Sequence, residues 1–148
     1  MGLAMCLALV FSAVVLSGML LEMPDQQLIV TPDIVARLEA LKPRLRFEPD
    51  GYYTGIHDPL EREQANASFA DLVGVLEKEL PEHPSRKFVL QQFSSHLRKF
   101  PSVDTEDRER AATHCEKIMD VLGIRSSDGV LNRWLYGPIL GRLVRRKP

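Results

Sequence analysis

Two prolines that each follow a capping residue constrain this chain more than any other feature of its sequence. Thr31 precedes Pro32, and Asp58 precedes Pro59. Threonine and aspartate side chains accept hydrogen bonds from the first turn of a helix. Proline is tolerated at the first helical position because the N–H that it lacks would have no partner there. Both pairs therefore predict the start of a helix.

Three further helix starts are expected near Ser85, at Asp104 or Thr105, and at residues 126–128. After each of the five starts, apolar residues recur at the spacing that places them on one helical face. The all-α fold class follows, as a small bundle of four to six helices. The repeating apolar positions are Ile34, Leu38 and Leu41; Ala65, Phe69, Leu72, Val73, Leu76 and Leu80; Val89, Phe93 and Leu97; Ala111, Cys115, Ile118 and Leu122; and Leu131, Trp134 and Leu135.

Prolines and glycines predict where these helices end. Pro43 and Pro81 disfavour continuation of the first two helices. Gly123 is expected to end the fourth helix in the left-handed conformation, followed by a hydrophobic contact from Ile124. The pair at 137–138, glycine followed by proline, is expected to break or sharply kink the last helix, so that residues 139–144 continue separately.

The N-terminal segment is predicted to lie in a membrane. Residues 3–21 carry no charge, and about 20 apolar residues as a helix match the hydrocarbon thickness of a bilayer, roughly 30 Å. We therefore expect residues 1–23 to be a signal anchor or a signal peptide and residues 24–148 to form one helical domain. A cleaved signal peptide usually begins with basic residues, which this segment lacks. A start at Met23, which would leave the domain in the cytosol, is the remaining alternative.

The charges that follow this segment predict its orientation. Glu22, Asp25 and Asp33 all precede the first basic residue, Arg37. Because basic residues hold flanking segments on the cytoplasmic side, we expect the protein to be anchored in the inner membrane or secreted, with the domain facing the periplasm.

Composition and motifs argue against several kinds of partner and cofactor. Nineteen basic and twenty acidic residues give a net charge of -1, so no overall field attracts nucleic acid. The sequence contains no HExxH, glycine-rich nucleotide or GxSxG motif. We therefore expect no nucleic-acid partner, no metal and no cofactor.

Three segments near the C-terminus carry a family resemblance: DTEDRER at 104–110, HCEKIMDVLGI at 114–124 and SSDGVLNRWLYG at 126–137. Together with the looser matches TPDIVARLEALK and YYTGI, they resemble a family of small bacterial proteins, domain of unknown function 4844. The resemblance implies a compact helical domain that is often exported, and it brings no activity, substrate or catalytic residue. The arginine-rich tail after Gly137 is not part of the pattern.

The loop at residues 47–57, FEPDGYYTGIH, is the most irregular part of the predicted domain. Irregular loops carry function more often than regular elements do, which makes Tyr52, Tyr53 and His57 candidate binding residues. The alternative is that a tyrosine and Ile56 only cover the core.

Asp107, Arg110 and His114 are three and four residues apart in the fourth expected helix. This spacing would form one polar face that binds a ligand or the basic group of a partner, or it would simply belong to a solvated surface with pairs such as that of Asp104 and Arg108. Asn132 and Trp134 are further candidates near the expected kink. Their alternative roles are a tie to the backbone and an anchor in the core.

Location and the lack of catalytic motifs lead to two hypotheses on function. The first is a non-enzymatic, envelope-facing interaction protein that binds a protein partner in the cell envelope, in an inhibitor, immunity-like or accessory role, and reaches the membrane through residues 1–23. The alternative is an extracytoplasmic hydrolase acting on lipid, peptide or glycan. Its acid-base pair would be His57 with Asp58, or Asp107 with His114.

Overall fold

The computed structural model describes residues 25–102 and 104–144, the last seven of these by their backbone only. This part of the chain is all-helical, with a short 3-10 turn (η1) after the first helix and no strand. The prediction of a small helical bundle is confirmed. The elements are α1 (Pro32–Leu41), η1 (Lys42–Arg44), α2 (Pro59–Glu79), α3 (Arg86–Leu97), α4 (Thr105–Leu122) and α5 (Val130–Val144).

Four of the five predicted helix starts are confirmed by their capping geometry, and the fifth helix, α5, begins at Val130, just after the expected cap at residues 126–128. Four side chains accept hydrogen bonds from amides in the first turn of their helices, and proline occupies the first turn of α1 and α2. Such caps satisfy amides that have no partner within the helix, and each contributes about 1 kcal/mol. The capping residues are Thr31, Asp58, Ser85 and Asp104.

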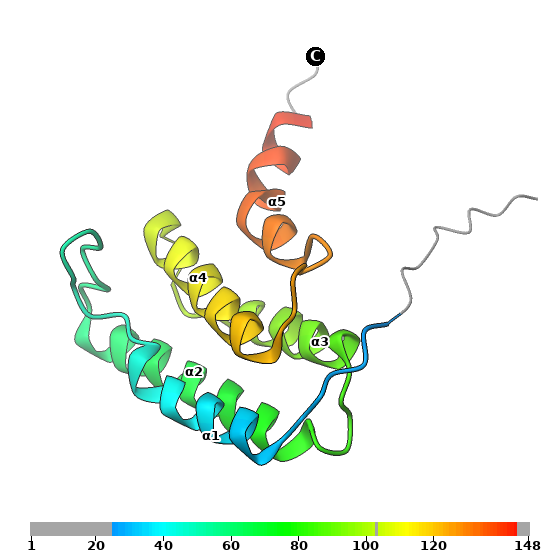
Figure 1. The fold of residues 1–148 in the computed structure, drawn as a ribbon. Helices are drawn as coiled ribbons and strands as arrows, with labels where there is room; N and C mark the ends of the chain where they lie inside the picture. The colour runs from blue at the N-terminus through cyan, green and yellow to red at the C-terminus, as the bar shows by residue number, and fades with distance from the viewer. Residues whose placement is uncertain (1–24, 103, 145–148) are drawn as a thin grey trace, which may run out of the picture.

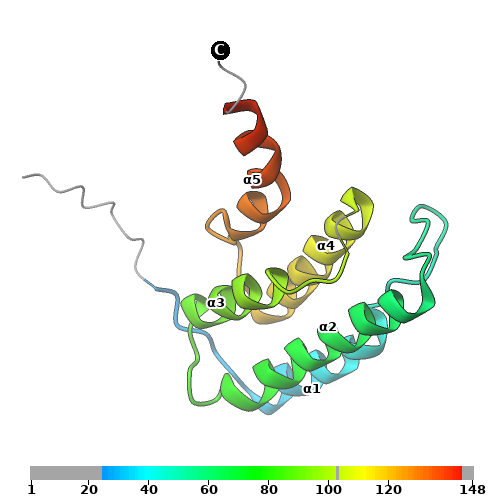
Figure 2. The ribbon, with the colours of Figure 1, turned by 180° about the vertical axis from the view of Figure 1, so that it is seen from behind.

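The helices form two layers and a projecting arm. α1 and α2 lie side by side, and α4 and α3 cover them (Figure 1). α5 packs against α3 and α4 and then extends away from the other helices, as the view from behind also shows (Figure 2). The chain enters this arrangement through an isolated bridge, in which the amide of Leu28 donates to the carbonyl of Pro84 at 2.8 Å.

Aromatic side chains from three parts of the chain meet in the core between the layers. Phe47, Phe69 and Phe93 are all completely buried. Phe47 precedes α2, and its ring lies 5.5 Å from that of Phe69, between centroids. The five predicted apolar positions within α2 and Leu80, which follows it, are buried. Each large apolar side chain removed from water contributes about 1.5–3 kcal/mol.

The predicted end of α4 is confirmed. Gly123 has a φ of 69°, in the left-handed region that favours glycine. The amide of Ile124 then donates to the carbonyl of Met119 at 2.9 Å, and Ile124 is buried. These are the hydrogen bond and the hydrophobic contact of a Schellman ending.

The predicted break at Gly137 and Pro138 is wrong, because α5 continues as a helix through both residues to Val144. Proline lacks the N–H that would donate to the carbonyl four residues earlier, which belongs to Trp134. In the structure the guanidinium of Arg108, on α4, donates to that carbonyl. A donor from another helix therefore takes the place of the missing N–H.

The predicted membrane segment, residues 1–23, lies outside the described residues. Within residues 25–102 and 104–144, no helix has the length and apolar character needed to cross a bilayer.

Candidate functional site

The loop at residues 47–57 is closed by hydrogen bonds between its own residues. The amide of Ile56 donates to the carbonyl of Phe47 at 3.1 Å, and the amide of Asp50 donates to the carbonyl of Tyr53 at 2.9 Å. The carboxylate of Asp50 accepts from the amides of Tyr52, at 3.1 Å, and Tyr53, at 3.0 Å. An aspartate that binds amides of the next residues stabilises a tight turn. The loop therefore has one defined shape.

Tyr53 points inward from this loop onto α4. Its hydroxyl donates to one carboxylate oxygen of Asp107, and the hydroxyl of Ser102 donates to the other at 2.6 Å. Tyr53 and Asp107 are each only 7% exposed. Burial and the neighbouring Asp107 raise the pKa of Tyr53 well above its ordinary value, so its hydroxyl stays a proton donor. Both oxygens of a buried carboxylate are thus satisfied.

Arg110 fastens the outer side of the same loop. Its guanidinium lies 4.3 Å from the centre of the Tyr53 ring and forms an ion pair with Asp50. This pairing lowers the pKa of the Asp50 carboxyl below its usual range. Arg110 therefore joins α4 to the turn that Asp50 shapes, through both charge and ring stacking.

His114 lies beneath the start of the loop and is completely buried. Its Nε2 is 3.0 Å from the carbonyl oxygen of Arg46, and since a carbonyl only accepts, Nε2 carries the hydrogen. Its Nδ1 is buried without a hydrogen-bond partner among the described residues. The imidazole lies nearly perpendicular to the rings of Phe47 and Phe69, with centroids 5.0 and 5.3 Å away. Burial lowers the pKa of His114 to about 4.

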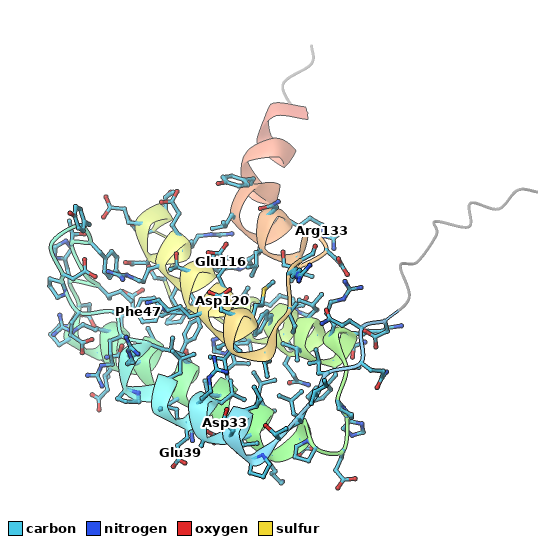
Figure 3. The ribbon with its side chains drawn as sticks, in the orientation of Figure 1. Asp33, Glu39, Phe47, Glu116, Asp120 and Arg133 are labelled. Carbon is cyan, nitrogen blue, oxygen red and sulfur yellow. The ribbon has the colours of Figure 1, made fainter. Side chains whose placement is uncertain are left out.

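Phe47 links the loop to the core at this point. Figure 3 shows its side chain between α4 and the layer formed by α1 and α2. Its amide donates to the side chain of Asn66 on α2 at 2.9 Å. Phe47, the first residue of the loop, is therefore held by contacts with both α2 and α4.

Tyr52 points the other way and is fully exposed, at 104%. It borders a surface hollow of about 400 Å³, which we call the Tyr52 hollow. Tyrosines 52 and 53 are adjacent in sequence but have opposite roles, since the first faces solvent and the second fills the contact with α4. The hollow is lined by Asp50, Tyr52, Tyr53, Glu106, Glu109, Arg110 and Thr113.

Four of the predicted binding residues meet at or below this hollow: Tyr52, Tyr53, Asp107 and Arg110. The expectation of one open polar face on α4 does not describe what the structure shows, because Asp107 and His114 are buried. In the sequence, Asp107 and His114 look like residues on the surface of a helix. The loop that covers them is distant along the chain, so no local pattern indicates that they are buried.

The other predicted binding residues lie elsewhere. Trp134 anchors α5, with its indole N–H donating to the carbonyl of Leu97 at 2.9 Å. Asn132 is exposed and borders a groove of about 780 Å³ at the turn from α4 to α5, along which Glu116 and Asp120 lie on α4 (Figure 3). His57 is exposed at the end of the loop.

The two proposed acid-base pairs have other contacts in the structure. Asp58 caps α2 by accepting from the amide of Glu61 at 2.8 Å. Asp107 binds Tyr53 and Ser102, and no hydrogen bond joins it to His114 within the part of the chain that is described. The described part of the chain includes no group of three or more acids, histidines or cysteines placed to hold a metal ion.

Several residues of the site were not found from the sequence. Asp50 could have been found, because aspartate before glycine is a turn signal. Ser102, Glu106 and Glu109 carry no such signal, since only the packing of the loop against α4 brings them to the site.

Comparisons with known proteins place this fold in a family. A crystal structure of a DUF3571 family protein from Acinetobacter baumannii AYE is similar to the chain, with a TM-score of 0.66 and 32% identity, over 76% of this chain and 95% of that one. A comparison with curated proteins found no match. The family described as Domain of unknown function (DUF4844) matches residues 29–138, which include every candidate binding residue and leave out the arginine-rich tail. The chain belongs to this family.

Proposed function

We propose that this domain is a non-enzymatic interaction protein that binds a partner protein through the Tyr52 hollow. The observation that carries the proposal is the full exposure of the Tyr52 ring on a loop of defined shape. A large aromatic ring normally leaves water on folding. Tyrosine supplies extensive contact area at low cost in side-chain entropy, and with arginine it dominates the binding energy of many interfaces.

The loop holds Tyr52 in place before any partner arrives. Its two internal backbone hydrogen bonds, the contact of Tyr53 with Asp107 and the ion pair of Asp50 with Arg110 all restrain the turn. Ordering a flexible loop on association costs binding free energy, and a loop that is already ordered avoids that cost. The ordered loop therefore offers a partner a rigid binding surface.

The charges around the hollow indicate the chemistry of the partner. Asp50 and Arg110 neutralise each other as an ion pair. Glu106 and Glu109 remain, both exposed and three residues apart on the same side of α4, and Glu109 makes no ion pair with the described residues. A lysine or arginine of the partner would meet these carboxylates and lie against the Tyr52 ring.

The cell envelope is the proposed location of this partner. The uncharged stretch at residues 3–21 and the acidic residues after it support a domain held at the membrane and facing the periplasm. An inhibitor, an immunity-like protein or an assembly accessory would each need a rigid binding surface in that position.

Site-specific crosslinking tests the proposal. A photoreactive phenylalanine at position 52 of the full chain, in its own host, is expected to capture one protein through a segment that contains lysine or arginine. The control places the same group at Val75, which is exposed on α2 and does not line the hollow. Equal capture at both positions would contradict the proposal.

The charge of the hollow is tested with the purified partner. Glu109→Lys is expected to weaken its binding by about tenfold or more, because like charges at an interface repel. Glu39 is exposed on α1 and does not line the hollow, so Glu39→Lys is the matched control with the same change in net charge. Equal losses from both variants would show that only overall charge matters.

A further inference from the structure

We infer that His114 is a pH-sensitive latch, whose protonation releases the loop at residues 47–57 and thereby weakens binding at the Tyr52 hollow. The link to binding rests on the function proposed above, whereas the release of the loop does not. The inference follows from where the imidazole lies, which of its nitrogens is satisfied, and which charges surround it.

The imidazole of His114 holds the base of the loop. Its Nε2–H donates to the carbonyl of Arg46, the residue directly before the loop. The same ring packs nearly perpendicular to that of Phe47, whose carbonyl accepts the hydrogen bond from Ile56 that closes the loop. One side chain on α4 therefore contacts both the residue before the loop and the loop's first residue.

The second nitrogen of His114 makes protonation costly in this position. Because Nε2 carries the hydrogen, Nδ1 has a bare lone pair, and it is buried without a partner among the described residues. A proton added there creates a charged N–H that no described group accepts. A buried charge without a partner is strongly unfavourable, so the protonated ring must reach water, which requires the cover formed by Arg46 and Phe47 to move.

The surroundings supply no negative charge to offset this proton. On its own helix, Lys117 and Arg110 are cations that disfavour protonation of His114. The loop side offers Arg46, whose guanidinium already pairs with Glu48 at 2.7 Å. From α2, the ring of Phe69 packs against the imidazole, and no acid among the described residues raises the pKa of His114.

A second histidine, His96 of α3, also packs against the ring of Phe69. Its imidazole is 4.7 Å from Phe69, and burial lowers its pKa to about 4 despite the opposing charge of Asp71. The structure records no contact between His96 and the loop at residues 47–57. A variant of His96 therefore tests whether any buried histidine would produce the same pH response.

The carboxylates of the loop do not account for the same response. Glu48 beside Arg46 has a pKa of about 2, and Arg110 lowers the pKa of Asp50. Glu48 therefore stays ionised while His114 gains its proton, and the ion pair with Arg110 favours the ionised form of Asp50. With a pKa of about 4 when buried and 6.5 when released, the ratio of closed to open loop should fall by about a hundredfold between pH 7 and pH 4.

Nuclear magnetic resonance on the full chain in detergent micelles tests the latch directly. We expect the amide signals of residues 47–57 to change with the same midpoint as the His114 ring signal, while amides in the middle of α2 stay constant. His114→Gln should remove this response, because glutamine can still donate to the carbonyl of Arg46 and cannot be charged. His83→Gln, at an exposed position, and His96→Gln should keep it.

Three results would overturn the inference. The loop response would persist in His114→Gln; or, in the wild type, the loop would respond at a midpoint different from that of the His114 ring; or it would change only when the helical circular dichroism of the whole domain is lost. The second and third need no variant, so they decide the matter even if His114→Gln does not fold.

Binding is then measured separately, with the protein captured through position 52 as the probe. Weaker binding at pH 4.5 than at pH 7, restored in His114→Gln, is expected. Equal binding at both pH values would overturn the link between loop release and binding and leave the proposed function standing. A loop that titrates with His114 in a chain that captures no partner would instead overturn the proposed function alone.

Discussion

The guanidinium of Arg108 lies 4.4 Å from the centre of the Trp134 ring and donates a hydrogen bond to the backbone carbonyl of the same residue. That carbonyl is the one which Pro138, four residues later, leaves without a helical donor. The indole N–H of Trp134 in turn donates to the carbonyl of Leu97 on α3. One arginine thus allows α5 to continue past a proline and remain attached to the bundle.

This relationship predicts a coupled pair of substitutions. Arg108→Ala should lower the free energy of unfolding by about 1–3 kcal/mol, because it leaves a carbonyl unsatisfied and removes the contact with the ring. In a Pro138→Ala background, where the helix supplies its own N–H, the same substitution should cost about 1 kcal/mol less. Urea denaturation of the four proteins measures the coupling. Strictly additive effects would mean that Arg108 does not replace the missing donor.

The buried contact between Tyr53 and Asp107 predicts different effects for the two adjacent tyrosines. Tyr53→Phe removes one hydroxyl and leaves an oxygen of a buried carboxylate without a donor, which should cost about 1–3 kcal/mol of stability. Tyr52→Phe, at a fully exposed position, should change stability by less than about 0.5 kcal/mol. Urea midpoints of the two variants compare them directly, and equal losses would contradict this division of roles.

Gly55 is predicted to tolerate no side chain. Its φ is 79°, and a Cβ would stand 2.6 Å from Cδ of Pro49. Gly55→Ala should therefore destabilise the domain by about 2 kcal/mol or more and displace the loop. Gly51, in the same loop, has no neighbouring atom within 4 Å of the place that a Cβ would take, so Gly51→Ala is the matched control and should be nearly neutral. Thermal unfolding of the two variants provides the measurement.

The stability of the domain should fall in mild acid. Burial lowers the pKa of His114 in the folded state to about 4, against an ordinary value of 6.5. Between these pH values the unfolded chain binds a proton that the folded chain does not. The contribution of His114 to the free energy of unfolding is therefore fully present above about pH 6.5 and falls as the pH drops toward 4. The loss from His114 is on the order of 3 kcal/mol. Urea unfolding of wild type and His114→Gln at pH 7 and pH 4.5 should show a smaller loss in the variant, and parallel losses would exclude His114 as the cause.

The sequence predicted the helices because their starts and ends are local. Thr31 and Asp58 bind amides within three residues of themselves, and Gly123 ends α4 through its own backbone conformation. Such signals are complete in a few consecutive residues. They hold wherever the helix packs.

The errors arose where a distant residue decides the outcome. Pro138 has the character of a helix breaker until Arg108, thirty positions earlier in the sequence, supplies a donor. Asp107 and His114 resemble surface residues until the loop at residues 47–57 covers them. The tyrosines were found as candidates from the irregularity of their loop, but which of them faces solvent depends on the contact with α4.

Tyr52 and Tyr53 are neighbours in the sequence and have separate roles, since Tyr53 contacts the core and Tyr52 faces solvent. The fold depends on the second and places no steric or hydrogen-bonding requirement on the first side chain. A member of this family can therefore change the residue at position 52, and with it the surface that it offers, without loss of the core contact one residue later. Under the proposed binding role of Tyr52, relatives can differ in the partner that they bind while their architecture stays the same.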